Sequence, residues 1–169
     1  RLIICANHIS DIDPVYLEMC QKRHVYFMAK AELFSKKIGA WFFGKQLGAF
    51  PVKRGAGDTG AIDTAKEIVN SGKLLGIFPE GTRSRDGQLG RAKSGAALIA
   101  AQTGAAVIPV AIKAKDQKIR PFHKAFILIG PALTLEELHL DNPEHPDLRY
   151  ASRKLMEVIG EMLERSVTR

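Results

Sequence analysis

The sequence predicts a single α/β domain, residues 1–169, with a mixed, largely parallel sheet flanked by helices. Short apolar runs of strand length alternate with stretches of helical periodicity, which is typical of this class. The length of 169 residues suits one domain with a sizeable core. Hydrophobic residues make up 46% of the chain and charged residues 25%, as in ordinary globular domains, so long disorder is not expected.

The order of the elements follows from these runs. Strands are expected at residues 2–6, 25–29, 49–52, 74–78, 107–112 and 125–129. Helices are expected at residues 14–20, 36–46, 59–70, 94–103 and 148–166. Gly72 and Gly104 stand where helices should stop, because glycine tolerates positive φ. The segment 141–147, with Pro143 and Pro146, is expected to be a surface loop.

Charge is unevenly distributed over a net +7. Residues 1–54 contain nine Lys or Arg and four Asp or Glu, a net +5, and residues 113–124 add +4. From residue 134 onward the chain has five bases and eight acids. This pattern predicts an anionic partner, such as phosphate groups, anionic lipid or nucleic acid, without choosing among them.

Few residues suggest a metal, a disulfide framework or a membrane span. Cys5 and Cys20 are too few for a disulfide framework or a zinc cluster, and they point to a reducing compartment. The histidines other than His8 lack ligand-like spacing, so no metal is expected. No signal peptide is visible, and the longest uncharged stretch, 94–112, is predicted to be helix, turn and strand.

Two glycine patterns resemble nucleotide sites. Gly39–Lys45 has the spacing of a phosphate-binding loop, but Gln46 replaces the Ser or Thr that would bind magnesium, so this site is not expected. Gly55, Gly57 and Gly60 follow a strand and open a helix, with Glu80 twenty residues further on, as in dinucleotide sites. A flexible loop before a helix is the simpler interpretation, and the dinucleotide site remains an alternative.

The first chemical cluster follows the first strand. His8 and Asp13 are five residues apart, and Pro14 starts a helix, so the carboxylate can fold back onto the imidazole. Such a pair is suited to general-base chemistry. The alternative is a capping loop, since Ser10, Asp11 and Asp13 are all natural caps.

Two further clusters also follow strands. Glu80-Gly81-Thr82-Arg83 offers a guanidinium, a hydroxyl and backbone donors, the elements of a phosphate clamp, or else forms a polar turn. Lys53-Arg54 offers two cations, or else a solvated edge. All three clusters stand at carboxyl ends of expected strands and could face one crevice. A base beside cations, without a nucleophilic Ser or Cys, indicates activation of a substrate hydroxyl next to a phosphate.

Four ordered motifs over residues 3–112 carry a resemblance to a known family. They are Asn-His-x-Ser-x-x-Asp at 7–13, Phe-Pro-Val-x-Arg at 50–54, Phe-Pro-Glu-Gly-Thr-Arg-Ser at 78–84 and Val-Ile-Pro-Val at 107–110. The sequence resembles the lysophosphatidate (1-acylglycerol-3-phosphate) acyltransferase family, which also includes glycerol-3-phosphate acyltransferases. The resemblance is looser toward the tail.

The resemblance implies a glycerolipid acyltransferase-like fold and a direct acyl transfer. The donor would be acyl-CoA or acyl carrier protein, the acceptor 1-acylglycerol-3-phosphate and the product phosphatidic acid, with no cofactor and no acyl-enzyme. His8 would be the general base, Asp13 would orient it, and Lys30 would help hold the developing oxyanion. Pro109 would shape the wall of the acyl site. The resemblance places the acceptor phosphate at Lys53, Arg54, Glu80, Gly81, Thr82, Arg83 and Ser84.

The resemblance also implies a membrane-associated enzyme with its active site on the cytoplasmic side. Family members commonly have a membrane-associating segment before the first motif, whereas this chain begins seven residues before His8, so the domain is expected to lack that segment. Residues 36–47, with aromatics flanked by lysines, are a candidate interfacial helix for an anionic membrane surface, or else a core helix.

Other functions stay open at this point. A glycerol-3-phosphate or other lysophospholipid acyltransferase would share the same motifs. A non-catalytic phospholipid-binding module would keep the basic crevice without needing His8, and an NAD-binding domain would use the 55–60 glycines. Nucleic acid is not expected as a partner, because no recognition motif accompanies the charge.

Overall fold

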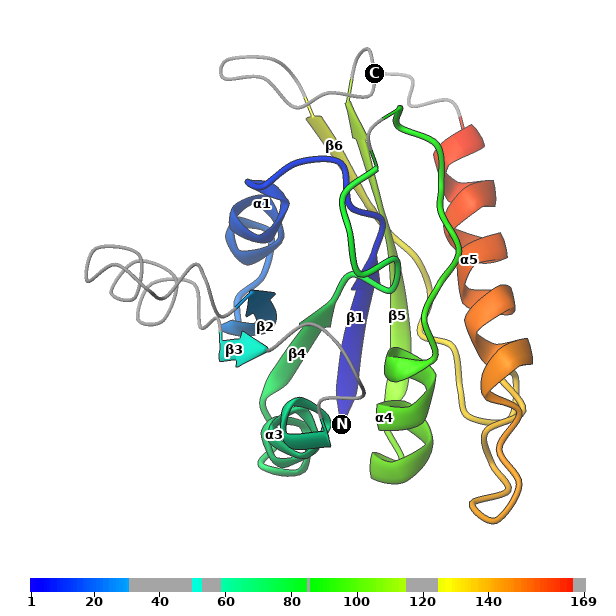
Figure 1. The fold of residues 1–169 in the computed structure, drawn as a ribbon. Helices are drawn as coiled ribbons and strands as arrows, with labels where there is room; N and C mark the ends of the chain where they lie inside the picture. Colours follow the sequence, from blue (N-terminus) through cyan, green and yellow to red (C-terminus); the bar gives the residue numbers. More distant parts are fainter. Residues whose placement is uncertain (31–49, 53–58, 85, 115–124, 166–169) are drawn as a thin grey trace.

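The computed structural model describes residues 1–30, 50–52, 59–84, 86–114 and 125–165, and Figure 1 shows their arrangement. The strands are β1 (Leu2–Ala6), β2 (Val25–Lys30), β3 (Phe50–Val52), β4 (Leu74–Ile77), β5 (Ala106–Ala114) and β6 (Ala125–Ile129). The helices are α1 (Asp13–Met19), α3 (Thr59–Asn70), α4 (Gly95–Thr103) and α5 (Leu148–Glu164). The expected helix at 36–46 and most of the 55–60 glycine loop lie outside the described residues.

The strands form one six-stranded sheet in the order β3-β2-β4-β1-β5-β6. All neighbouring pairs are parallel except β5 and β6, which are antiparallel. The expected α/β class with a mixed, largely parallel sheet is therefore confirmed. The central strands β1 and β4 are buried almost throughout, as their unbroken apolar sequences LIICA and LLGI predict for strands covered on both faces.

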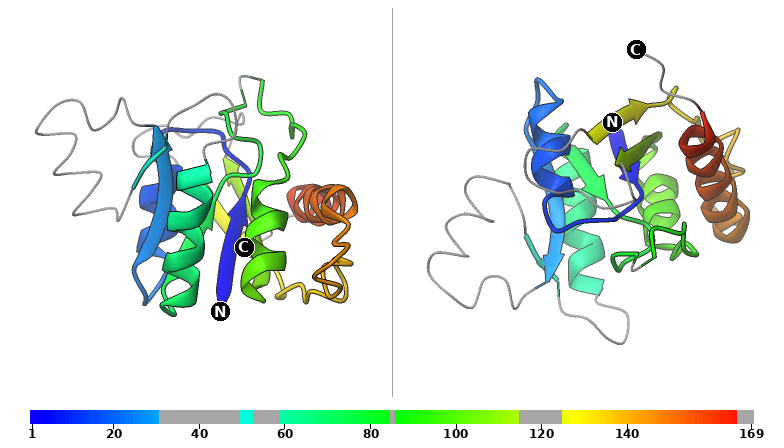
Figure 2. Two further views of the ribbon diagram at one scale, coloured as in Figure 1. Left: turned by 60° about the horizontal axis from the view of Figure 1, so that its bottom comes forward. Right: turned by 90° about the horizontal axis from the view of Figure 1, so that it is seen from above.

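Successive residues of β1 point into two separate cores. Ile3 and Cys5 belong to the larger core, which α3, α4 and α5 complete, whereas Ile4 and Ala6 belong to a smaller core that Leu17 of α1 joins. Figure 2 shows α1 on the opposite side of the sheet from α3 and α4. The strand period of two thus gives β1 two buried faces.

The helix ends agree with the sequence. Gly72 and Gly104 have φ of 77° and 69°, and Gly104 is the C-cap of α4, with its N–H donating to the carbonyl of Ala100. At the start of α5 the Asp147 carboxylate accepts the N–H of Tyr150 at 2.8 Å. The strand β5 is longer than expected because β1 pairs with its first half and β6 with its second.

Two further properties of the described residues bear on function. No helix among them is long and apolar enough to cross a bilayer. Cys5 and Cys20 are free thiols. Cys5 is buried in β1, and this burial raises the pKa of its thiol well above the ordinary value, so it is not a reactive nucleophile.

Candidate active site

The order of the sheet brings two of the three sequence clusters together. β1 and β4 are parallel neighbours in the register Ile3↔Leu75 and Cys5↔Ile77, so the segments that follow them leave the same edge side by side. β3 ends two strands further along, beyond β2. The third cluster, with Lys53 and Arg54, lies outside the described residues.

The first cluster contains the expected histidine–carboxylate pair. His8 Nδ1 and Asp13 Oδ2 are 2.8 Å apart, and the Asp13 side chain has no solvent exposure. The same oxygen accepts the N–H groups of Ile9 and Ser10, each at 2.8 Å. The N-cap of α1 is Ile12 and has no side-chain capping bond, so the capping interpretation of Asp13 is not what the structure shows.

This contact determines which nitrogen of His8 is available for chemistry. With Nδ1–H donating to a buried carboxylate, Nε2 carries the lone pair. The ring stacks on Phe78, with centroids 4.1 Å apart and planes 19° apart, and Phe78 in turn stacks on Phe27 at 5.9 Å. The imidazole is therefore fixed by a hydrogen bond at its edge and by an aromatic ring against its face.

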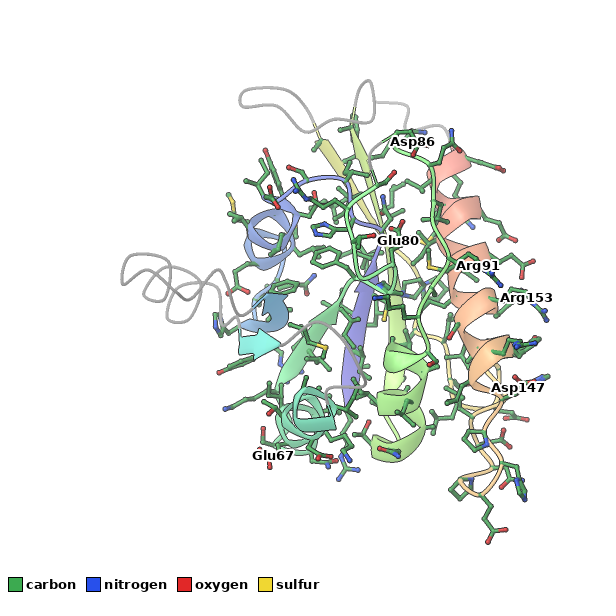
Figure 3. The ribbon with its side chains drawn as sticks, in the orientation of Figure 1. Glu67, Glu80, Asp86, Arg91, Asp147 and Arg153 are labelled. Carbon is green, nitrogen blue, oxygen red and sulfur yellow. The ribbon has the colours of Figure 1, made fainter. Side chains whose placement is uncertain are left out.

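The second cluster forms hydrogen bonds with the backbone of His8. The His8 N–H donates to Glu80 Oε1 at 3.0 Å, and the Ser84 N–H donates to the His8 carbonyl at 2.8 Å. Glu80 Oε2 accepts the N–H of Gly90 at 2.8 Å. In Figure 3, Glu80 lies at the ends of β1 and β4, inside the loop that connects β4 to α4. The sequence assigned Glu80 to the phosphate site, whereas both of its oxygens accept backbone N–H groups.

The remaining polar groups of this cluster face outward. Arg83 Nη1 and Asp11 Oδ2 form an exposed ion pair of 2.6 Å between the two clusters. Thr82 is exposed. The Ser84 hydroxyl donates to Asp86 Oδ1 at 3.1 Å, and the pKa of Asp86 is lowered by the N–H of Gln88 and, next, by this hydroxyl.

Lys93 is a cation that the sequence reasoning missed. Gly81 adopts φ of 70°, and a Cβ placed there would lie 3.0 Å from Lys93 Nζ. The Lys93 N–H also donates to the Pro79 carbonyl at 2.8 Å. The spacing of residues in the sequence does not predict that Lys93 lies beside Gly81. The two meet because the loop after β4 folds back alongside residues 79–81.

Three other residues of the predicted site or of the motifs lie in or next to β2, β5 and β1. Lys30 ends β2, and its side chain is not described. Pro109 is buried in β5 beside Gly130 and Met162, on the α5 side of the sheet, away from the core that Phe78 joins. The amide of Asn7 accepts the Ile112 N–H at 2.7 Å and donates to its carbonyl at 3.0 Å, which extends the β1–β5 pairing.

Neither a metal site nor a dinucleotide site emerges from the described residues. No group of three or more His, Cys, Asp or Glu in these ranges could hold a metal ion. Glu80, the acid that a dinucleotide ribose would need, is only 8% exposed and is occupied by the N–H groups of His8 and Gly90. The dinucleotide alternative therefore loses its ribose ligand.

The described geometry defines a class of site. A histidine paired with a buried carboxylate follows β1, and two cations, Arg83 and Lys93, lie along the segment that follows the neighbouring strand β4. Both segments leave the carboxyl ends of parallel strands, where ligands bind in open α/β sheets. A histidine held in this way can act as a general base, and cations on the neighbouring segment can bind an anionic group.

Comparison with known proteins gives the family. The sequence model of the Acyltransferase family matches residues 1–113, and the chain belongs to this family. A chloroplastic 1-acyl-sn-glycerol-3-phosphate acyltransferase of Arabidopsis thaliana is 34% identical over 113 residues, which are 65% of this chain and 31% of that protein. A 1-acyl-sn-glycerol-3-phosphate acyltransferase of Bacillus subtilis is 33% identical over 148 residues, 84% of this chain and 72% of that protein.

The fold has a counterpart among solved structures. The crystal structure of a 1-acyl-sn-glycerophosphate acyltransferase from Thermotoga maritima superposes with a TM-score of 0.73 at 24% identity, covering all of this chain and 67% of that one. At this identity the likeness concerns the fold. The chain spans about a third of the length of the Arabidopsis relative and a larger share of the bacterial ones.

Proposed function

We propose that the protein transfers an acyl group from a thioester donor, acyl-CoA or acyl carrier protein, to the free hydroxyl of 1-acylglycerol-3-phosphate, giving phosphatidic acid. The observation that carries this proposal is the 2.8 Å contact between His8 Nδ1 and the fully buried Asp13 carboxylate. The family supplies the reaction type, and the names of the relatives supply the acceptor.

The reaction needs one base and no covalent enzyme intermediate. His8 Nε2 takes the proton of the acceptor hydroxyl while its oxygen attacks the thioester carbonyl carbon. Asp13 stabilises the imidazolium that forms. When the tetrahedral intermediate collapses, the carbon–sulfur bond breaks and the imidazolium returns the proton to the leaving thiolate. Lys30 would help hold the oxyanion.

Cations near the base would hold the acceptor phosphate. Arg83 and Lys93 lie beside the turn that follows β4, and Lys53 and Arg54 would join them from the end of β3, with Thr82 and Ser84 as hydroxyl donors. Arg83 is paired with Asp11, so a bound phosphate would replace one anionic partner with another.

The test is thiol release from acyl-CoA and, separately, from acyl carrier protein, with and without lysophosphatidate. Wild-type protein should release thiol only with the acceptor present, and His8→Ala should lose this release while keeping its circular dichroism spectrum. His24→Ala is the matched control. Thiol release with glycerol-3-phosphate in place of lysophosphatidate would instead indicate a glycerol-3-phosphate acyltransferase. Acceptor-independent lipid binding without thiol release would instead indicate a non-catalytic phospholipid-binding module.

We also propose that the domain works at an anionic membrane surface, with its site facing the cytoplasm. The acceptor is a lipid, and the net charge of +7 favours anionic headgroups. Co-sedimentation should be greater with vesicles containing phosphatidylglycerol than with phosphatidylcholine alone, and should weaken as salt is raised. Equal sedimentation with both vesicles would contradict the charge argument.

A further inference from the structure

Glu80 has contacts unlike those of a substrate-binding side chain. Its side chain is largely buried, and each carboxylate oxygen accepts one backbone N–H, from His8 at 3.0 Å and from Gly90 at 2.8 Å. Four residues on, the Ser84 N–H donates to the His8 carbonyl at 2.8 Å. Residues 80–84 thus engage both polar backbone groups of His8.

We propose that Glu80 is a positioning residue for His8 and not a ligand of the acceptor. Its carboxylate fixes the backbone from which the imidazole projects and ties that backbone to the segment around Gly90. Hydrogen bonds to an ionised acceptor are stronger than neutral ones, and a carboxylate beside a phosphate would repel it. The kinetic consequence rests on the proposed acyl transfer, whereas the backbone contacts do not.

Gly90 packs directly against the Glu80 carboxylate, with no room for a side chain. A Cβ at Gly90 would lie 2.9 Å from Glu80 Oε2, closer than the two atoms can approach, so a side chain there would displace the carboxylate. The neighbouring Lys93 N–H holds the same segment to the Pro79 carbonyl. Gly95 offers a matched control, since a Cβ there would meet only Ile62 Cδ1, at 3.8 Å.

The kinetic test compares Glu80→Gln, Gly90→Ala and Gly95→Ala with the wild type. A glutamine amide has one acceptor oxygen and a donor nitrogen, so it cannot accept both N–H groups. We expect kcat to fall about 10- to 100-fold in the first two variants, as for other residues that orient a reacting group. The KM for lysophosphatidate should stay within about twofold, because Glu80 does not touch the acceptor. Gly95→Ala should match the wild type in both constants.

A second measurement does not depend on activity. Amide hydrogen exchange in ¹⁵N-labelled protein should be faster for His8 or Gly90 in Glu80→Gln, by about tenfold or more, and unchanged for Ile4 in the core of β1. Gly90→Ala tests the same contact at His8 if Glu80→Gln does not fold.

Two results would overturn the proposal. One is a raised KM with unchanged kcat in Glu80→Gln, which would make Glu80 an acceptor ligand. The other is unchanged exchange of both amides. If the wild type transfers no acyl group, the proposed function fails, and the exchange measurement still decides the role of Glu80.

Discussion

The described residues include two histidine–carboxylate pairs, which are chemically alike but lie in different surroundings. His8 and Asp13 lie beyond the carboxyl end of β1, with side-chain exposures of 17% and 0%. His24 and Glu18 are 2.5 Å apart before the amino end of β2, with exposures of 37% and 23%. The two pairs therefore lie at opposite ends of the parallel strands of one sheet.

The surroundings of the two pairs also differ. His8 stacks flat on Phe78, and its backbone is held on both sides by residues 80–84. His24 meets Tyr26 edge-on, with planes 79° apart, and its partner Glu18 mainly ties the start of β2 by accepting the Val25 N–H. Contact with a carboxylate is common to both pairs, and a cation is near His24 too, since Lys73 lies over the Tyr26 ring. Between the two described pairs, what distinguishes His8 is its fully buried carboxylate and the hold of residues 80–84 on its backbone.

The largest expected effect separates the two histidines. His8→Ala should lower kcat for acyl transfer by about 10³-fold, the usual contribution of a general base. His24→Ala should leave kcat within about twofold, since its imidazole lies at the other edge of the sheet. Thiol release from acyl-CoA measures both. Comparable losses in the two variants would mean that the position in the sheet does not distinguish the pairs.

Substituting each carboxylate should affect kcat in the same direction as substituting its histidine partner. Asp13→Asn removes the charge that stabilises the imidazolium and should lower kcat by about 10²-fold. Glu18→Gln should not change kcat measurably, although it weakens the bond to Val25. Steady-state kinetics of both variants test this. A fully active Asp13→Asn would show that the carboxylate serves only to hold the loop.

The ring of Phe27, on which Phe78 and then His8 stack, can be displaced by a substitution at Gly76. A Cβ at Gly76 would overlap the Phe27 ring and lie 2.9 Å from Val25 Cγ1, and Phe27 is only 2% exposed. Gly76→Ala should therefore lower the free energy of unfolding by about 2 kcal/mol, as overpacked cores do. Urea denaturation measures this.

Gly160 in α5 provides the control for that change. A Cβ at Gly160 would meet Leu89 Cδ2 at 3.6 Å, an ordinary contact, so Gly160→Ala should stabilise the helix by a few tenths to about 1 kcal/mol. Equal free energies of unfolding for Gly76→Ala and the wild type would mean that Phe27 moves aside at no cost.

The smallest effect concerns the ion pair between the two clusters. Asp11 and Arg83 are both well exposed, so their attraction is weak, about 0.2–1 kcal/mol. Asp11→Asn would free Arg83 for the acceptor phosphate and should lower the KM for lysophosphatidate by up to about fivefold. Glu157→Gln, in the exposed pair with Lys154 on α5, makes the same charge change as a control. A raised KM in Asp11→Asn would show that Asp11 holds Arg83 in its binding position.

Much of the fold could be predicted because it depends on local patterns. The apolar runs at β1 and β4, the periodicity of α5 and the glycines at 72 and 104 each encode their element within a few residues. The contact of His8 with Asp13 was predictable for the same reason, since one turn of chain separates them. The other end of the site, at Lys30, Lys53 and Arg54, stays a prediction.

The contacts of Glu80 could not be predicted from its residue type. A carboxylate beside a glycine, a threonine and an arginine suggests polar recognition, and only the contact across β1 and β4 shows that its partners are backbone amides 72 and 10 residues away. Backbone N–H groups are present at nearly every residue, so the sequence contains no mark of which ones a carboxylate will meet.

By itself, the sequence determined the α/β class, the order of the elements and the pairing of His8 with Asp13, because these depend on hydrophobic period and short loops. The tertiary structure decided that β4 lies beside β1. This neighbour relation brings Glu80 to the backbone of His8 and Arg83 to Asp11, and it leaves the chemically similar His24 at the opposite ends of the strands. The reason is physical: strand order is set by packing among residues distant in the chain, which local patterns do not encode.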